Sequence, residues 1–127
     1  MALILDTNAF SAFADGQASV TDAVGRAERL AIPVIVLGEY RYGIAQSRHK
    51  TSYESWLKEW IAKVPVLNID EETTHPYAAI YLELKKKGKP IPANDLWIAA
   101  LCLQHSLPLL SQDRHFDLVS GLRRLDW

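Results

Sequence analysis

The stretch Leu3-Ile4-Leu5-Asp6-Thr7-Asn8 decides how the rest of this chain is interpreted. Its three aliphatic residues are typical of a short strand that is buried on both faces, as in a parallel sheet. Asp6 then falls at the carboxyl end of that strand, and Thr7 and Asn8 can bond the free N–H groups of a following helix. Ligands of open α/β sheets bind outside the carboxyl ends of the strands. Asp6 is therefore either a ligand-binding acid or only a helix N-cap.

The bulk composition is that of one ordinary globular domain, spanning 1–127. Of the 127 residues, 49% are hydrophobic and 23% are charged. A net charge of −1 argues against a protein that holds nucleic acid mainly by bulk positive charge, but it leaves room for local basic patches. Cys102 is the only cysteine, which excludes an internal disulfide and fits a reducing compartment. No run reaches transmembrane length, so we expect a cytoplasmic protein with no membrane contact.

Apolar periodicity predicts strands that alternate with helices. Strands are expected at 3–5, 32–36, 65–69, 107–110 and 122–127. Helices are expected at 7–14, 20–30, 37–46, 53–64, 71–87 and 94–103. The alternation predicts an α/β fold with a mostly parallel sheet that helices cover on both faces.

The helix expected at 53–64 carries the strongest apolar stripe of the sequence. We interpret its Trp56 and Trp60 as core residues rather than as a platform for stacking bases. Together with Tyr40 and Tyr42, the stripe offers more apolar surface than one small sheet needs. We therefore expect part of this surface to be buried in a homodimer or under a partner's helix.

Four acids share one kind of position relative to the expected strands. Asp6 directly follows a strand and Asp113 lies just past one, whereas Glu39 and Asp95 lie in the first turns of helices. If the strands are parallel, Asp6, Glu39 and Asp113 meet at one edge of the sheet, and Asp95 can join them if its helix also starts at that edge. Neighbouring carboxylates raise one another's pKa values and are costly without a cation, and Mg²⁺ or Mn²⁺ prefers oxygen ligands. Taken singly, each acid is equally well explained as a cap, a dipole partner or a strand end. Taken together, they indicate a metal site.

Other catalytic motifs are absent from the sequence. It contains no GxxxxGK[ST], GxGxxG, HExxH or CxxC pattern, and its histidines are too scattered to suggest a zinc site. A receiver-like signalling domain with an acidic Mg²⁺ pocket is an alternative. Such a domain has two adjacent acids after its first strand, whereas here only Asp6 is present.

Four segments resemble the signature segments of PIN-domain ribonucleases: 5–8, 37–43, 92–100 and 110–116. The ending 121–127 is similar to that of VapC-type toxins of bacterial toxin–antitoxin pairs. The resemblance covers essentially the whole chain, in the expected order. It implies a three-layer α/β/α fold with a central, mainly parallel five-stranded sheet. It also implies endonucleolytic cleavage of single-stranded RNA that depends on Mg²⁺ or Mn²⁺, and a homodimer that a small antitoxin neutralises.

The resemblance further implies roles for individual residues. The acids that match the family's catalytic metal ligands are Asp6, Glu39, Asp95 and Asp113. Asn8 and Ser111 match their polar companions, although the family more often has Thr at the second position, and Asp117 is a weaker match to a further acid. The expected contacts to RNA are Arg41, Arg48, Lys50, Arg114 and His115, each equally well explained as solvated surface charge. A catalytically inactive PIN-like binding module is the other alternative, and the four intact acids argue against it.

Overall fold

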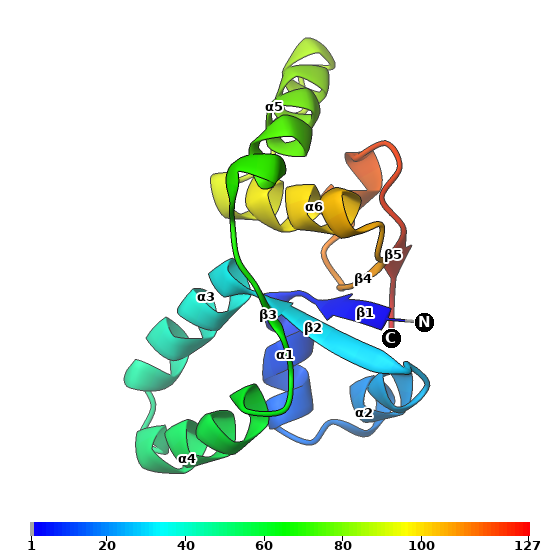
Figure 1. Cartoon of the computed structure of the whole chain (residues 1–127). Helices are drawn as coiled ribbons and strands as arrows, with labels where there is room; N and C mark the ends of the chain where they lie inside the picture. The colour runs from blue at the N-terminus through cyan, green and yellow to red at the C-terminus, as the bar shows by residue number, and fades with distance from the viewer. Residues whose placement is uncertain (1) are drawn as a thin grey trace.

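The computed structural model describes residues 2–127, and its strands form one five-stranded sheet (Figure 1). The strands are β1 (Ala2–Leu5), β2 (Arg29–Pro33), β3 (Val66–Leu67), β4 (Leu109–Leu110) and β5 (Arg124–Leu125). They lie in the order β3-β2-β1-β4-β5, and every neighbouring pair is parallel. The predicted parallel sheet and its last edge strand are confirmed.

Helices cover both faces of this sheet. They are α1 (Thr7–Ala14), α2 (Ala18–Gly25), α3 (Val34–Ala45), α4 (Lys50–Ile61), α5 (Glu71–Lys86) and α6 (Ala93–His105), with a 3-10 helix η1 (Arg114–Leu118) before β5. In Figure 1, α1 and α2 lie on one side of the sheet, and α6 lies on the other with α5 packed against it. The fold is therefore the three-layer α/β/α arrangement. No helix within residues 2–127 is both long and apolar enough to cross a bilayer.

The centre of the sheet is also the centre of the core. Ile4 and Leu5 of β1 are completely buried, because β1 is paired on both edges and covered on both faces. Burying each side chain of this size contributes roughly 1.5–3 kcal/mol. Helix α6 adds an unbroken buried run, 98–102, which ends with the free thiol of Cys102. The strand at the start of the chain is thereby fixed firmly enough to carry a functional side chain at its end.

The aromatic stripe of α4 packs inside the chain. Trp56 and Trp60 stack with their ring centroids 5.8 Å apart, and both lie against Phe10 of α1. The ring of Tyr40 meets Phe10 edge-on at 4.8 Å and is 4% exposed. The interpretation of the two tryptophans as core is confirmed, and Tyr40 is buried with them, whereas Tyr42 of the same surface is 70% exposed. The burial of this surface in a homodimer or under a partner's helix stays a prediction. The other exposed large apolar side chains are Tyr81 and Leu82 of α5.

The boundary between β2 and α3 differs from the prediction. The strand expected at 32–36 ends at Pro33, and the β-branched run 34–36 is the first turn of α3. Val36, Tyr40 and Ile44 recur every four residues and form the buried face of that helix, which outweighs the strand preference of the run. Glu39 consequently lies in the second turn of α3 rather than the first, so the helix dipole no longer explains it. The helix expected at 20–30 likewise ends at Gly25, and Leu30 belongs to β2.

Candidate active site

The most promising site lies where the order of the strands reverses. The chain builds outward from β1 to β3 and then crosses back to add β4 and β5 on the other side of β1. Crevices at such switch points, outside the carboxyl ends of the strands, are where open α/β sheets bind ligands. Asp6 directly follows β1, and Ser111 directly follows β4. These two residues come from opposite ends of the sequence and meet at the centre of the sheet.

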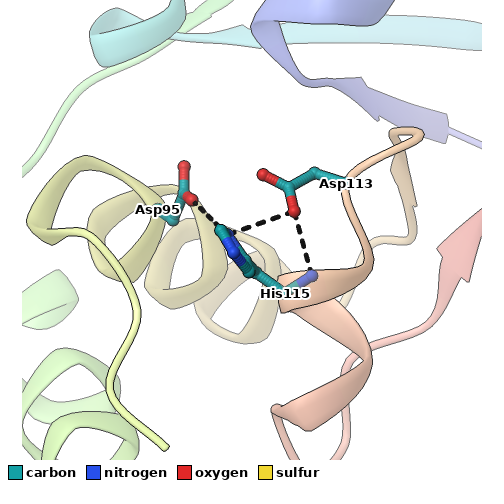
Figure 2. Close-up of side chains that lie close together, drawn as sticks. All are labelled: Asp95, Asp113 and His115. Atoms are coloured by element: carbon teal, nitrogen blue, oxygen red, sulfur yellow. Dashed lines mark hydrogen bonds and ion pairs between the residues drawn. The ribbon is translucent and has the colours of Figure 1, made fainter.

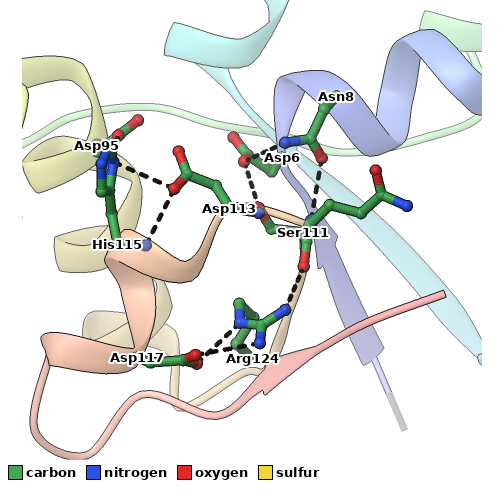
Figure 3. A network of polar contacts seen from close by, with 9 residues as sticks. Asp6, Asn8, Asp95, Ser111, Asp113, His115, Asp117 and Arg124 are labelled. Carbon is green, nitrogen blue, oxygen red and sulfur yellow. Dashed lines mark hydrogen bonds and ion pairs between the residues drawn. The ribbon is translucent and has the colours of Figure 1, made fainter.

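Asp6 is both a helix cap and the buried centre of a polar network (Figure 3). It is 5% exposed. Its Oδ1 accepts a hydrogen bond from the backbone N–H of Thr7 at 2.8 Å. Its Oδ2 accepts one from the hydroxyl of Ser111 at 2.6 Å and one from the amide of Asn8 at 3.3 Å. The interpretation of Asp6 as a helix cap is therefore confirmed, and its role as a ligand-binding acid stays a prediction.

Ser111 connects Asp6 to the next acid. Its hydroxyl is buried, donates to Asp6 and accepts the backbone N–H of Asp113 at 2.9 Å. Asp113 in turn caps η1, because its Oδ1 accepts the backbone N–H of His115 at 3.0 Å. Asn8 supports the same loop by accepting the backbone N–H of Gln112 at 3.4 Å. A single serine thus sets the separation between two of the predicted acids.

Asp95 reaches the same place from α6, where it lies in the first turn as predicted. Figure 2 shows the imidazole of His115 beside the carboxylates of Asp95 and Asp113. The Nδ1 atom of His115 lies 3.3 Å from Oδ2 of Asp95 and 3.1 Å from Oδ1 of Asp113. One ligand atom from each of the three residues lies within 4.8 Å of the other two.

Glu39 joins the cluster through a residue whose role was not predicted. Its Oε1 accepts a hydrogen bond from the hydroxyl of Thr7 at 2.7 Å. Thr7 and Asn8 were expected to cap α1, but their side chains instead hold Glu39 and Asp6. Glu39 also lines an open depression together with Thr7, Tyr42 and Asn94. The partnership between Thr7 and Glu39 spans 32 positions, so no local motif reveals it.

The four acids lie in one another's electric field. Burial raises the pKa of Asp6 to about 6, aided by repulsion from Asp95 and Asp113 and opposed by the hydrogen bonds from Ser111 and Thr7. Burial also raises the pKa of Asp95, with repulsion from Asp113 and Glu39 adding to it and the contact with His115 opposing it. The carboxylates of Asp6 and Asp95 are therefore less stable as anions than they are in water.

Asp117 does not belong to this cluster. Its carboxylate forms a two-pronged pair with Arg124, with Nε 2.8 Å from Oδ1 and Nη2 3.1 Å from Oδ2. This hydrogen bonding lowers the pKa of Asp117. Arg124 also donates from Nη1 to the carbonyl oxygen of Ser111 at 3.0 Å, which braces the loop from behind. Nothing in the sequence around Arg124 marks it for this task, and it was not predicted.

Some of the remaining predicted residues contact the acids, and the others lie on the surface. Asn8, Ser111 and His115 contact the acids directly. Arg41 and Arg114 are exposed on the surface, on α3 and at the start of η1. Lys50 pairs with Glu54 along α4 at 4.0 Å, as an ordinary surface charge does.

Comparisons with known proteins agree with this geometry. The model of the PIN domain family matches residues 3–122. The chain is 29% identical to ribonuclease VapC5 of Mycobacterium tuberculosis over 93% of this chain and 87% of that protein. It is 35% identical to ribonuclease VapC1 of Methanocaldococcus jannaschii over 76% of this chain and 70% of that protein. The crystal structure of VapBC2 from Rickettsia felis, bound to a DNA fragment from its promoter, matches with a TM-score of 0.89 at 25% identity and covers 100% of this chain and 99% of the solved one.

The match to the family model spans nearly the whole chain and both strands that carry the central acids, β1 and β4. The structural match extends over the entire sheet and its helices. The fold and the relatives agree, and the protein is a member of the PIN-domain family, of the VapC type.

Proposed function

We propose that this protein is a ribonuclease toxin that cuts single-stranded RNA at the four-acid site with Mg²⁺ or Mn²⁺. The observation that carries the proposal is the gathering of acids around one loop: ligand atoms of Asp95, Asp113 and His115 lie within 4.8 Å of one another, and Ser111 joins Asp113 to Asp6, whose pKa is raised to about 6. The relatives in Mycobacterium tuberculosis and Methanocaldococcus jannaschii are ribonucleases by name, which supplies the class of reaction. The proposal extends that class to this chain.

The chemistry of the acids fits a hard divalent cation. All four offer carboxylate oxygen, the ligand that Mg²⁺ and Mn²⁺ favour. Burial is the main cause of the raised pKa values of Asp6 and Asp95, and repulsion from neighbouring carboxylates adds to it. A bound cation would remove that repulsion. Asp6, Glu39 and Asp95 would hold one ion. Asp113, together with Asp6, would help to hold a second ion.

The chain's own residues do the positioning. When bound at these acids, a divalent ion would activate water as the nucleophile and neutralise the charge that develops on the phosphate. Ser111 holds Asp6 and Asp113 in place, and Thr7 holds Glu39, so the acids are already arranged before RNA arrives. No side-chain nucleophile is needed. Arg41 and Arg114 are exposed and free to meet the phosphates of the strand.

An exposed aromatic ring favours an unpaired substrate. Tyr42 is 70% exposed and lines the depression that also contains Glu39 and Asn94. Such a ring offers a stacking surface to a base that is not already stacked in a duplex. We expect Tyr42→Ala to raise KM for a single-stranded RNA more than it lowers kcat. A steady-state titration of the substrate measures the two parameters separately.

The proposal includes protein partners and a place of action. The Rickettsia felis relative was solved as a VapBC complex, which supports a small antitoxin as the partner of this chain. A homodimer acting in the cytoplasm, where RNA is found, completes the proposal. Light scattering should report twice the chain mass of 14.3 kDa at micromolar concentration. A monomer at that concentration would contradict the dimer.

Activity is tested with single-residue variants of the acids. Purified protein should cut RNA in Mg²⁺ or Mn²⁺ and stop when EDTA is added. Asp95→Asn should lower the rate at least about 100-fold, the size of losing one electrostatic contact to a transition state. Asp22→Asn, an exposed acid of α2, is the matched control and should leave the rate unchanged. Cleavage that persists in Asp6→Asn and Asp95→Asn alike would rule out the assignment, and RNA binding without cleavage would favour an inactive binding module.

A further inference from the structure

We propose that His115 is a nitrogen ligand of the metal ion in this site and makes the site prefer a first-row transition ion such as Mn²⁺ over Mg²⁺. The inference rests on the proposed function, because it adds one ligand to the metal site proposed there. It also changes how the ligands are shared: Asp95 and Asp113, which the proposed function assigns to two ions, would hold one ion together with His115. It concerns a residue that the four-acid pattern leaves out.

The first argument is the spacing of the ligand atoms. Nδ1 of His115 lies 3.1 Å from an oxygen of Asp113 and 3.3 Å from an oxygen of Asp95. Adjacent ligands of one octahedral ion, each about 2.1 Å from the metal, lie about 3 Å apart. The three atoms all lie within 4.8 Å of one another, and they come from the start of α6, the loop after β4 and the start of η1. Three separate elements therefore deliver ligand atoms to one point.

The second argument is that the backbone fixes where His115 sits. Its N–H donates to Oδ1 of Asp113, which starts η1 at this residue. Phe116, the next residue, is completely buried and anchors the same turn in the core. The ring contacts in Figure 2 are with the two carboxylates. A mobile surface histidine would lack both the hydrogen bond from its backbone N–H and the buried neighbour that fix the position of His115.

The third argument is chemical. Mg²⁺ takes oxygen ligands and keeps several of its waters, whereas transition ions also accept imidazole nitrogen. A site of carboxylates alone binds both kinds of ion through oxygen. One imidazole in the ligand set adds affinity for the transition ion and little for Mg²⁺. His115 is thus the residue of this site that discriminates between metals.

The experiment uses Mn²⁺ as the probe and needs no RNA. Electron spin-echo spectroscopy of the Mn²⁺-loaded protein should show coupling to a ¹⁴N nucleus, and His115→Gln should abolish it. His75→Gln, an exposed histidine of α5, is the matched control and should keep the coupling. Calorimetry should give a roughly 10- to 100-fold weaker Kd for Mn²⁺ in His115→Gln. The Kd for Mg²⁺ should stay nearly unchanged.

The outcomes separate this inference from the proposed function. Mn²⁺ that binds to the native protein without ¹⁴N coupling would overturn the role of His115 and leave the four-acid site standing. Equal weakening of Mn²⁺ and Mg²⁺ in His115→Gln would overturn the claim of metal preference. Failure of the native protein to bind either ion would remove the metal site, and the proposed function with it. Circular dichroism of His115→Gln should match the native protein, because the bond to Asp113 comes from the backbone.

Discussion

Two carboxylate groups lie on opposite sides of Ser111, and they differ in burial and in the charge of their neighbours (Figure 3). Asp117 is half-exposed and is paired with Arg124, which lowers its pKa. Asp6 is buried among other acids, and its pKa is raised to about 6. Arg124 neutralises the carboxylate of Asp117. The carboxylate of Asp6 instead has amide and hydroxyl partners and acidic neighbours. This is the difference expected between a structural ion pair and the proposed metal site.

The largest expected effect is stabilisation by metal. Mg²⁺ at about a thousand times its Kd should raise the free energy of unfolding by about 4 kcal/mol through mass action. Asp95→Asn should gain less from Mg²⁺, because a ligand is missing, whereas Asp117→Asn should gain as much as the native protein. The measurement is a set of melting curves for each protein in EDTA and in Mg²⁺.

The same curves test the repulsion among the acids. In EDTA, Asp95→Asn should be more stable than the native protein by up to about 1 kcal/mol, because the fold disfavours the charged form of Asp95. A lower melting temperature of Asp95→Asn in EDTA, with no change of either melting temperature in Mg²⁺, would mean that the acids are only caps. Asp6 and Asp117 would then both be purely structural carboxylates.

The pH dependence of the metal-free protein should sharpen the contrast. The folded-state pKa of Asp6 is about 6 against a model value of 3.8, so the folded state binds more protons between these values. By linkage, the contribution of Asp6 to stability is fully present below pH 4, falls as the pH rises toward 6 and stays constant above that. The loss should reach about 3 kcal/mol, from roughly two pKa units.

Asp117 should behave in the opposite way. Its folded-state pKa is lowered, so its contribution is present above its unfolded pKa and is lost as the pH falls through the folded value. Urea unfolding in EDTA at several pH values checks both signs. Relative to the native protein, Asp6→Asn should lose the decline between pH 4 and 6, and Asp117→Asn should keep it. An unchanged decline in Asp6→Asn would mean that another group causes it.

A further set of expected effects concerns the ion pair of Asp117 and Arg124 itself. Arg124→Gln should cost about 2 kcal/mol of stability, because the side chain is 12% exposed and loses charged hydrogen bonds to Asp117 and to the Ser111 carbonyl. Asp117→Asn removes only the exposed half of the pair and should cost less than about 1 kcal/mol. Arg48→Gln, an exposed arginine, is the control and should lie within about 0.5 kcal/mol of the native protein. An equal loss of unfolding free energy in Arg124→Gln and Arg48→Gln would show that the contacts of Arg124 with Asp117 and Ser111 do not stabilise the fold.

Sequence patterns located the acids because each lies next to an apolar run. Asp6 and Asp113 follow strands β1 and β4 closely, and a parallel sheet brings such positions together. Asp95 was placed by the buried run of α6 that it begins. These inferences need only local periodicity and the parallel arrangement, both of which the sequence displays.

The start of α3 could not be placed by composition. Val34, Ile35 and Val36 favour a strand by propensity, yet they form helix because the positions four apart, from Val36 onward, face the core. That spacing was present in the sequence and was the signal to weigh above propensity. The earlier start of α3 matters for the site, because it places Glu39 in the second turn, where interaction with the helix dipole no longer explains an acid.

The hydrogen-bond partners around the acids, Thr7 and Arg124, could not be predicted from the sequence for a different reason. Thr7 was interpreted as a cap, and its true partner, Glu39, depends on how α1 packs beside α3. Arg124 was one of several arginines until β5 placed it behind Ser111. Contacts between distant segments are fixed by packing, which one sequence does not display.

The place of β1 and β4 at the centre of the sheet has a consequence for synthesis of the protein. Asp6 leaves the ribosome 105 positions before its partner Ser111. Domains fold as units once enough of the chain has emerged, and contacts between distant segments form last. The nascent chain therefore has no assembled site before Ser111 has emerged. A ribonuclease built in this order would be inert towards RNA, including the messenger RNA that encodes it, until that point.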